Sequence, residues 1–201
     1  MLTLHDYADS GNGYKITLLA ARLGRPLDRV EVDITRGESR TSEFLAINPN
    51  GKVPVLRLDD GTVLTESNAI LCHLAEGTAF LPPPGLARTR VLEWLFWEQY
   101  SHEPMIATLR YWRKHVPVLD PARQVQLEAK RAGGHHALTV MERRLAAAPW
   151  LTDAGCTIAD ISLYAYTHVA GEAGFDLAPY PAVRAWLARM AAEPGHVAMG
   201  A

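Results

Sequence analysis

A lysine, an acidic residue and a serine lie within one short segment, residues 48–67, which reads NPNGKVPVLRLDDGTVLTES. Lys52 supplies a positive charge. Glu66 and Ser67 supply a carboxylate and a hydroxyl just before an apolar pattern that predicts a helix. We expect Ser67 to cap this helix, and the unpaired N–H groups at a helix start favour a carboxylate ligand. The segment therefore combines a cation with an anion-binding helix start.

The same segment contains a Val-Pro pair that predicts an open backbone edge. Pro54 has no N–H donor, which suits an edge or a special turn at the start of a strand. A cis Val53-Pro54 bond would expose the N–H and C=O of Val53 to a ligand, and the sequence leaves the isomer open. A cation, an open backbone edge and an anion-binding helix start are together complementary to a small peptide with charges at both ends.

A second polar group opens the first predicted helix, where the chain reads Ser10-Gly11-Asn12-Gly13. No cysteine lies near this place, so a catalytic pair of enzyme thiols is excluded there. A hydroxyl and an amide at a helix N-terminus favour a negative charge, and a bound thiolate would suit that position. The alternative is that Ser10 or Asn12 only caps the helix. Tyr7, at the end of the first predicted strand, is either a third candidate or a core residue.

The elements that position these groups follow the order β-α-β-α-β-β-α. Alternating apolar residues predict strands near residues 2–7 and 30–34, with a helix between them. A hairpin over residues 53–65 and a helix from residue 67 complete the N-terminal half of the chain. Two parallel strands joined by a helix, followed by a hairpin and a helix, predict an α/β thioredoxin-like domain.

The run Pro-Pro-Pro-Gly at residues 82–85 is the clearest break in the chain, because three consecutive prolines cannot be helical. We expect a first domain over residues 1–78, a proline-rich linker over 79–85, and an all-α domain over 86–201. The first helix of that second domain should run to about residue 116, with a kink at Pro104.

In the helical half, Thr157-Ile-Ala-Asp160 has the spacing of a capping box. We interpret this motif as a folding signal. The aromatic residues from Trp94 to Trp112 are mostly core positions at helical spacing, yet one or two of them, such as Tyr111 or Trp112, could line a pocket for an apolar molecule.

Composition limits the functions that remain. A formal net charge of -2 gives no support for nucleic-acid binding. The two cysteines and the scattered histidines have no metal-ligand spacing, so no metal site is predicted. No secretory signal is visible, and no apolar run approaches the roughly 20 residues that span a membrane. We therefore expect a cytoplasmic protein that binds neither membranes nor nucleic acids.

The segment NPNGKVPVL followed by TES, together with WLTDAGCTIADISL in the helical half, resembles the glutathione S-transferases of the bacterial, theta-like or beta-like kind. The resemblance covers the whole chain. It implies that Lys52 meets the glycine carboxylate of glutathione and that Val53, beside Pro54, bonds the cysteinyl backbone. It also implies that Glu66 and Ser67 hold the γ-glutamyl end.

The family uses a Tyr, Ser or Cys to activate the thiol, so the resemblance makes Ser10 the first candidate, Asn12 the second and Tyr7 the third. It implies a detoxifying transferase that conjugates reduced glutathione, a cosubstrate and not a cofactor, to an apolar electrophile. A homodimer is also implied. Two alternatives stay open: another glutathione-dependent enzyme, such as a reductase, peroxidase, dehalogenase or ether-cleaving enzyme, and a non-catalytic binding module.

Overall fold

The computed structural model describes residues 1–200 and divides the chain into two compact units. One unit is Met1–Glu76 together with the chain from Pro194 onward, and the other is Gly77–Glu193. The end of the chain differs from the prediction, which assigned residues 86–201 to the helical domain. Residues from Pro194 pack with the first unit because long-range contacts hold them there: the hydroxyl of Tyr14 donates to the carbonyl of Val197 at 2.7 Å.

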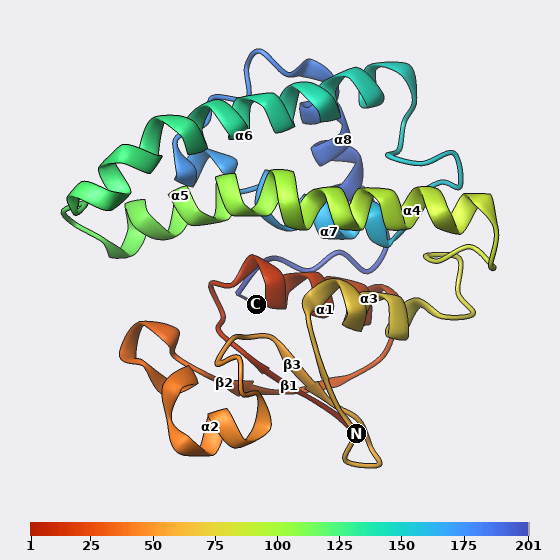
Figure 1. The fold of residues 1–201 in the computed structure, drawn as a ribbon. Helices are drawn as coiled ribbons and strands as arrows, with labels where there is room; N and C mark the ends of the chain where they lie inside the picture. Colours follow the sequence, from red (N-terminus) through yellow and green to blue (C-terminus); the bar gives the residue numbers. More distant parts are fainter. Residues whose placement is uncertain (201) are drawn as a thin grey trace. The chain divides into compact units, whose positions relative to one another are not determined.

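The first unit is built on a four-stranded sheet with the order β2-β1-β3-β4 (Figure 1). Its strands are β1 (Leu2–Asp6), β2 (Leu27–Glu31), β3 (Val55–Arg57) and β4 (Val63–Thr65). β1 pairs parallel with β2 and antiparallel with β3, and β3 pairs antiparallel with β4. The predicted thioredoxin-like half is confirmed.

Three helices complete this unit: α1 (Gly11–Arg22), α2 (Ser42–Ile47) and α3 (Ser67–Ala75). Helices α1 and α3 pack against each other on one face of the sheet, and α2 lies against the other face (Figure 1). Phe44 of α2 packs with Val32 and Val55 in a buried apolar cluster on that second face.

The second strand begins and ends three residues earlier than the alternation of Val30, Val32 and Ile34 predicted. Its register with β1 ends at Glu31. The side chain of Asp33 then accepts the N–H of Thr35 at 2.8 Å and starts a 3₁₀ helix, η1 (Ile34–Arg36). A second short 3₁₀ helix, η2 (Glu38–Arg40), leads to α2.

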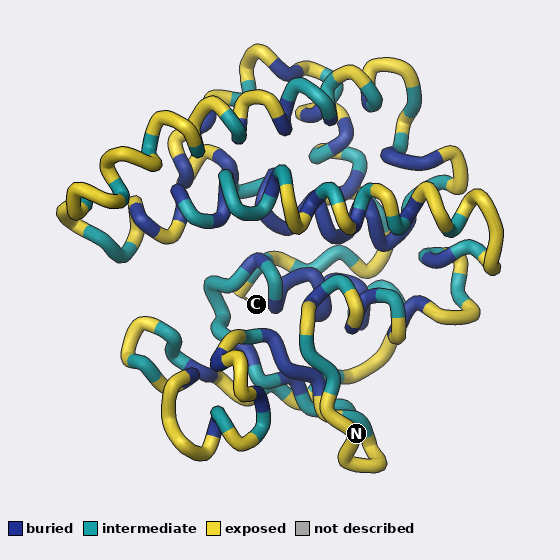
Figure 2. Tube along the Cα trace, viewed as in Figure 1, coloured by how far each residue is buried: buried dark blue, intermediate teal, exposed yellow. Residues whose placement is uncertain are grey.

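The second unit is helical, as predicted. It contains α4 (Leu86–Trp97), α5 (Glu103–His115), α6 (Pro121–Ala147), α7 (Ile158–Thr167) and α8 (Pro181–Ala192). A 3₁₀ turn, η4 (Ala170–Ala173), follows α7. All ten residues of α7 are buried, and Figure 2 shows how little of this segment reaches the surface.

The long helix expected over residues 86–116 is divided by one π-helical turn, η3 (Glu98–His102). Pro104 follows this turn, in the first turn of α5. The proline is accommodated there because the preceding π-helical turn already interrupts the regular series of helical hydrogen bonds. The irregularity in this helix is therefore the π-helical turn η3, which comes just before Pro104, the residue at which we expected a kink.

The capping box at the start of α7 is confirmed. Asp160 is fully buried, and it accepts the N–H of Thr157 at 3.0 Å. The same carboxylate also accepts the N–H of Leu151 at 3.1 Å and the indole N–H of Trp186 at 3.0 Å. One aspartate thus joins the start of α7 to the preceding loop and to α8.

Candidate active site

Helix α1 begins at Ser10, which is its N-cap. The Ser10 hydroxyl accepts the N–H of Gly13 at 3.2 Å, and the Ser10 N–H donates to the carbonyl of Tyr7 at 2.7 Å. Ser10 therefore caps the helix, as the simpler interpretation of this residue required. The hydroxyl hydrogen of a serine that accepts a bond can still be donated, so capping does not remove Ser10 from a thiol site.

Helix α3 begins differently, because its N-cap is Glu66 and not Ser67. The prediction that Ser67 caps this helix is wrong: Ser67 is the first helical residue, and its hydroxyl bonds elsewhere. Glu66 has φ 65° and ψ 110°, and its side chain makes no capping bond. A positive φ in a residue other than glycine is strained and is often found at functional sites.

The starts of α1 and α3 are joined by a side-chain hydrogen bond. The hydroxyl of Ser67 donates to Oδ1 of Asn12 at 3.2 Å. This bond turns the amide oxygen of Asn12 toward α3, so its NH₂ group is directed away from Ser67. Two residues that the sequence placed in separate polar groups, 55 positions apart, thus meet in one network.

Sequence reasoning missed Lys15, which is fully buried and donates to the Ser67 hydroxyl at 3.3 Å. It also donates to Oδ1 of Asn68 at 3.5 Å. A buried ammonium needs polar partners of this kind to offset its lost hydration. The signal was a lysine between Tyr14 and Ile16, both buried, on the apolar side of a predicted helix.

Asp6 is a second residue that the sequence did not single out. It is 2% exposed, and a side chain at position 13 would collide with its carboxylate, which explains the glycine at the first turn of α1. Burial raises the pKa of Asp6 to about 7, although Arg29 lies 3.7 Å away and opposes the shift. Within residues 1–200, Oδ1 of Asp6 has no hydrogen-bond partner.

The loop before β3 carries the remaining predicted residues. The Val53-Pro54 bond is cis. The side chain of Asn48 donates to the carbonyl of Lys52 at 2.8 Å and shapes this loop, while the Lys52 side chain is exposed.

The register of the sheet brings the cis-proline loop, the end of β1 and the start of α3 together at one end of the strands. Val55 pairs with Thr65 on one side and with His5 on the other. Because these pairs are antiparallel, the cis-proline loop before Val55 lies beside the Glu66 start of α3 and beside the end of β1. This end of the sheet therefore presents an exposed lysine, the cis-proline loop and two helix starts, while β3 itself is an interior strand paired with β1 and β4. Among residues 1–200, no group of three or more metal-ligating side chains is assembled, and no helix is both long and apolar enough to cross a membrane.

Comparison with known families decides the identity of this arrangement. Residues 10–76 match the N-terminal domain of glutathione S-transferases, and residues 124–189 match the C-terminal domain. The chain belongs to the glutathione S-transferase family. The predicted resemblance is confirmed, and the two matched segments lie one in each unit of the chain.

The individual relatives of this chain have different names. The disulfide-bond oxidoreductase YfcG of Escherichia coli is 34% identical over 197 residues, which is 94% of this chain and 89% of YfcG. The crystal structure of a glutathione S-transferase from Pseudomonas fluorescens is 48% identical, has a TM-score of 0.94, and the match covers 98% of both chains. The structure of the yeast prion protein Ure2p in complex with glutathione is 26% identical, with a TM-score of 0.85 and coverage of 96% of this chain and 91% of that chain.

Proposed function

We propose that this protein conjugates the thiol of reduced glutathione to an electrophilic carbon of a largely apolar cosubstrate. The observation that carries the proposal is the Asn12–Ser67 bond, which joins two helix starts beside the cis-proline loop that precedes β3. Helix starts favour anions, and glutathione has two carboxylates and a thiol that must ionise to react. Membership of the family and the glutathione complex of Ure2p support this ligand.

In this proposal the peptide lies along the cis-proline loop before β3. The exposed ammonium of Lys52 pairs with the glycine carboxylate, and Val53, held beside cis Pro54, exchanges backbone hydrogen bonds with the cysteinyl unit. Glu66 accepts from the γ-glutamyl ammonium. The backbone at Ser67, at the start of α3, donates to the γ-glutamyl carboxylate.

We assign the thiolate donor to Asn12, with Ser10 as the second candidate. Lys15 and Asn12 orient the hydroxyl of Ser67, and that hydroxyl fixes the amide of Asn12. The NH₂ group of Asn12 is then preorganised to donate to a sulfur at the start of α1, where a negative charge is favoured. Ser10 already accepts the N–H of Gly13, and its own hydrogen supplies a second donor.

The chemical step follows from this arrangement. The thiol releases its proton to solvent, and Asn12 and the helix start stabilise the sulfur anion. The sulfur then donates an electron pair to the electrophilic carbon and forms a C–S bond. The bond to the leaving group breaks and its electron pair departs with that group; in an addition, the adjacent atom takes the electron pair and then a proton.

The test is the ultraviolet absorbance of the bound thiolate as a function of pH. A free thiol has a pKa of about 8.5, and a donor at a helix start lowers the pKa of a bound thiol by about one to two units. Asn12→Ala should move the titration upward and reduce turnover more at about pH 6.5 than at about pH 9, with little loss of glutathione affinity. If Ser10→Ala moves the titration and Asn12→Ala does not, the role passes to Ser10; if neither does, the thiol is not activated here.

A second function is favoured by the 34% identity to YfcG, whose name is disulfide-bond oxidoreductase. Here the bound thiolate would attack a disulfide, form a mixed disulfide and release one thiolate. A second glutathione would then release the other thiol and leave oxidised glutathione. Turnover of a small dialkyl disulfide with none of an electrophile panel would select this function. Glutathione binding without either activity would select a binding module.

The family resemblance also leads us to propose a homodimer in the cytoplasm. Analytical ultracentrifugation of the purified protein tests the first part, because a dimer of this 22.1 kDa chain has twice the monomer mass. A single species at the monomer mass would contradict it.

A further inference from the structure

The buried lysine of α1 contacts the first two residues of α3. Lys15 is fully buried, and its ammonium donates to the Ser67 hydroxyl at 3.3 Å and to Oδ1 of Asn68 at 3.5 Å. Ser67 and Asn68 begin α3, which packs against α1. An ammonium group has three donors and no acceptor, so the direction of both hydrogen bonds is fixed.

Lys15 shares the Ser67 hydroxyl with Asn12. The two residues of α1 lie on the same side of the helix, because residues three positions apart are neighbours there. Lys15 donates to the hydroxyl oxygen, and Oδ1 of Asn12 accepts the hydroxyl proton at 3.2 Å. The hydrogen bonds therefore run in one direction, from the ammonium through the hydroxyl to the amide oxygen of Asn12.

This direction matters because the two ends of the Asn12 amide have opposite effects on a sulfur anion. The NH₂ group donates to an anion, whereas the oxygen repels it. Ser67 is 5% exposed, so its proton needs an acceptor within the protein. Lys15 occupies Oδ1 of Asn68, the next residue along α3, and the proton of Ser67 goes to Asn12.

We propose that Lys15 is a positioning residue whose ammonium fixes the direction of the Ser67–Asn12 hydrogen bond, so that the NH₂ group of Asn12 faces the bound sulfur. Without the ammonium, the Ser67 hydroxyl is free to rotate to Asn68, and the amide of Asn12 can turn over and present its oxygen to the sulfur. The inference rests on the proposed function, which assigns the thiolate donor to Asn12. The direction of the amide itself is measured without glutathione.

Nuclear magnetic resonance of the asparagine side chains tests this direction. Protein labelled with ¹⁵N in asparagine gives one NH₂ signal each for Asn12, Asn48, Asn50 and Asn68, and the signal missing in Asn12→Ala identifies Asn12. In Lys15→Met this signal should move, and its NH₂ protons should gain a nuclear Overhauser contact with the β protons of Ser67. Lys15→Arg keeps donors and no acceptor, so it should retain the wild-type pattern.

The absorbance of the bound glutathione thiolate against pH measures the consequence for chemistry. Lys15→Met should raise the pKa of the bound thiol by about one unit and reduce turnover about tenfold at about pH 6.5, but much less at about pH 9. Lys15→Arg should restore most of the loss. Asp6, whose pKa is raised to about 7, titrates in the same range, so each variant is compared with wild type at every pH.

A double variant separates positioning from a direct effect of the lysine charge. If Lys15 acts through the amide, Lys15→Met should move the thiol titration no further in a protein that already carries Asn12→Ala. A further upward shift in the double variant would show that the ammonium acts on the sulfur directly, and it would overturn the proposal.

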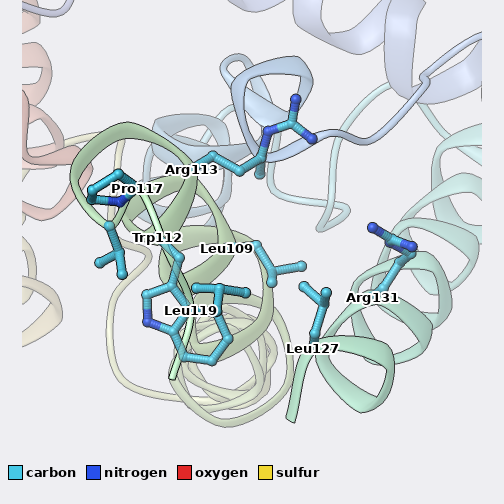
Figure 3. A pocket seen from close by; sticks show the side chains of 9 residues that line it. Leu109, Trp112, Arg113, Pro117, Leu119, Leu127 and Arg131 are labelled. Carbon is cyan, nitrogen blue, oxygen red and sulfur yellow. The ribbon is translucent and has the colours of Figure 1, made fainter. Parts of the chain in front are cut away.

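Two variants control for a general loss of stability. Thr17→Val removes a hydroxyl of α1 that bonds to the carbonyl of Gly13 at 3.4 Å. Leu109→Ala removes a buried side chain of α5 from the wall of a pocket of about 410 Å³ in the helical unit, a wall that also includes Trp112 (Figure 3). Leu109→Ala should lower the melting temperature, and neither variant should change the Asn12 signal or the thiol titration.

An Asn12 signal that Lys15→Met leaves unchanged would overturn the proposal. So would a thiol titration that Asn12→Ala shifts and Lys15→Met does not, although Asn12 would then remain the thiolate donor. If Asn12→Ala leaves the titration unchanged, the proposed activation of the thiol fails. A changed Asn12 signal in Lys15→Met would still support the control of the amide by Lys15, and an unchanged signal would overturn it.

Discussion

The starts of α7 and α3 show two different uses of a helix N-terminus. At α7, Thr157 and Asp160 satisfy the local N–H groups, and Asp160 also binds Leu151 and Trp186 in the interior. At α3, the N-cap Glu66 is exposed, has a positive φ and makes no side-chain capping bond. The first arrangement stabilises the helical unit. The second gives the first N–H groups of the helix no side-chain cap and carries backbone strain at Glu66.

The largest effect is expected at the start of α7. Asp160→Ala leaves the buried N–H groups of Leu151 and Trp186 without acceptors, so the free energy of unfolding should fall by about 3–5 kcal/mol. Urea denaturation measures the loss. Glutathione affinity of the folded fraction should stay the same.

Asp153→Ala is the matched control, because Asp153 is 93% exposed and its ion pair with Arg144 contributes at most about 1 kcal/mol. If the Asp160→Ala protein melted normally and bound glutathione weakly, the start of α7 would serve ligand binding and not stability, which would contradict this comparison.

Asp6, at the end of β1, packs against Gly13 in the first turn of α1 and should make the stability of the protein depend on pH. Burial raises the pKa of its carboxyl from 3.8 to about 7, so the folded protein holds a proton that the unfolded chain has lost. The resulting stabilisation is complete below about pH 4 and is lost as the pH rises through about 7. By linkage it amounts to at most about 4 kcal/mol.

Urea unfolding of wild type and Asp6→Asn between about pH 4 and pH 8 tests this sign. The wild-type protein should lose stability relative to the variant as the pH rises. Arg29 and Glu31 are the charged groups that influence Asp6. Parallel profiles would show that Asp6 is ionised throughout.

An intermediate effect is expected at the loop beside α3. Lys52→Ala should weaken glutathione binding by about 1.5–3 kcal/mol, because a charge-assisted bond to the glycine carboxylate is lost. Calorimetric titration measures the change. Arg57→Ala is the control, since Arg57 is an exposed cation on the adjoining strand β3. Equal losses in the two variants would indicate a general electrostatic effect and would remove Lys52 from the site.

The smallest effect has opposite signs for stability and for binding. Glu66→Gly relieves the positive φ and should raise the free energy of unfolding by up to about 1 kcal/mol, while it weakens glutathione binding. Glu66→Gln keeps the strain and should weaken binding alone. If Glu66→Gly gains stability and binds glutathione normally, the strain at α3 has no role in ligand binding.

The local features of this protein could be predicted from its sequence. The capping box joins residues three positions apart, and the proline run after residue 81 breaks the chain by its own geometry. The strand-turn-strand pattern before Ser67 and the apolar spacing of the helices likewise depend on near neighbours. The segment from Asn48 to Ser67 predicted a peptide site, and together with WLTDAGCTIADISL in the helical half it indicated the family.

Tertiary structure decided what depends on distant residues. Lys15 reaches the side chains of Ser67 and Asn68 because α1 packs on α3, which brings together groups more than 50 positions apart. The same packing drew the hydroxyl of Ser67 to Asn12 and left Glu66 as the N-cap. Asp6 acquired its raised pKa from burial against Gly13, and the residues after Pro194 returned to the first unit through Tyr14. Local sequence sets the preference for helix, strand and turn, whereas burial and side-chain pairing depend on which elements pack together.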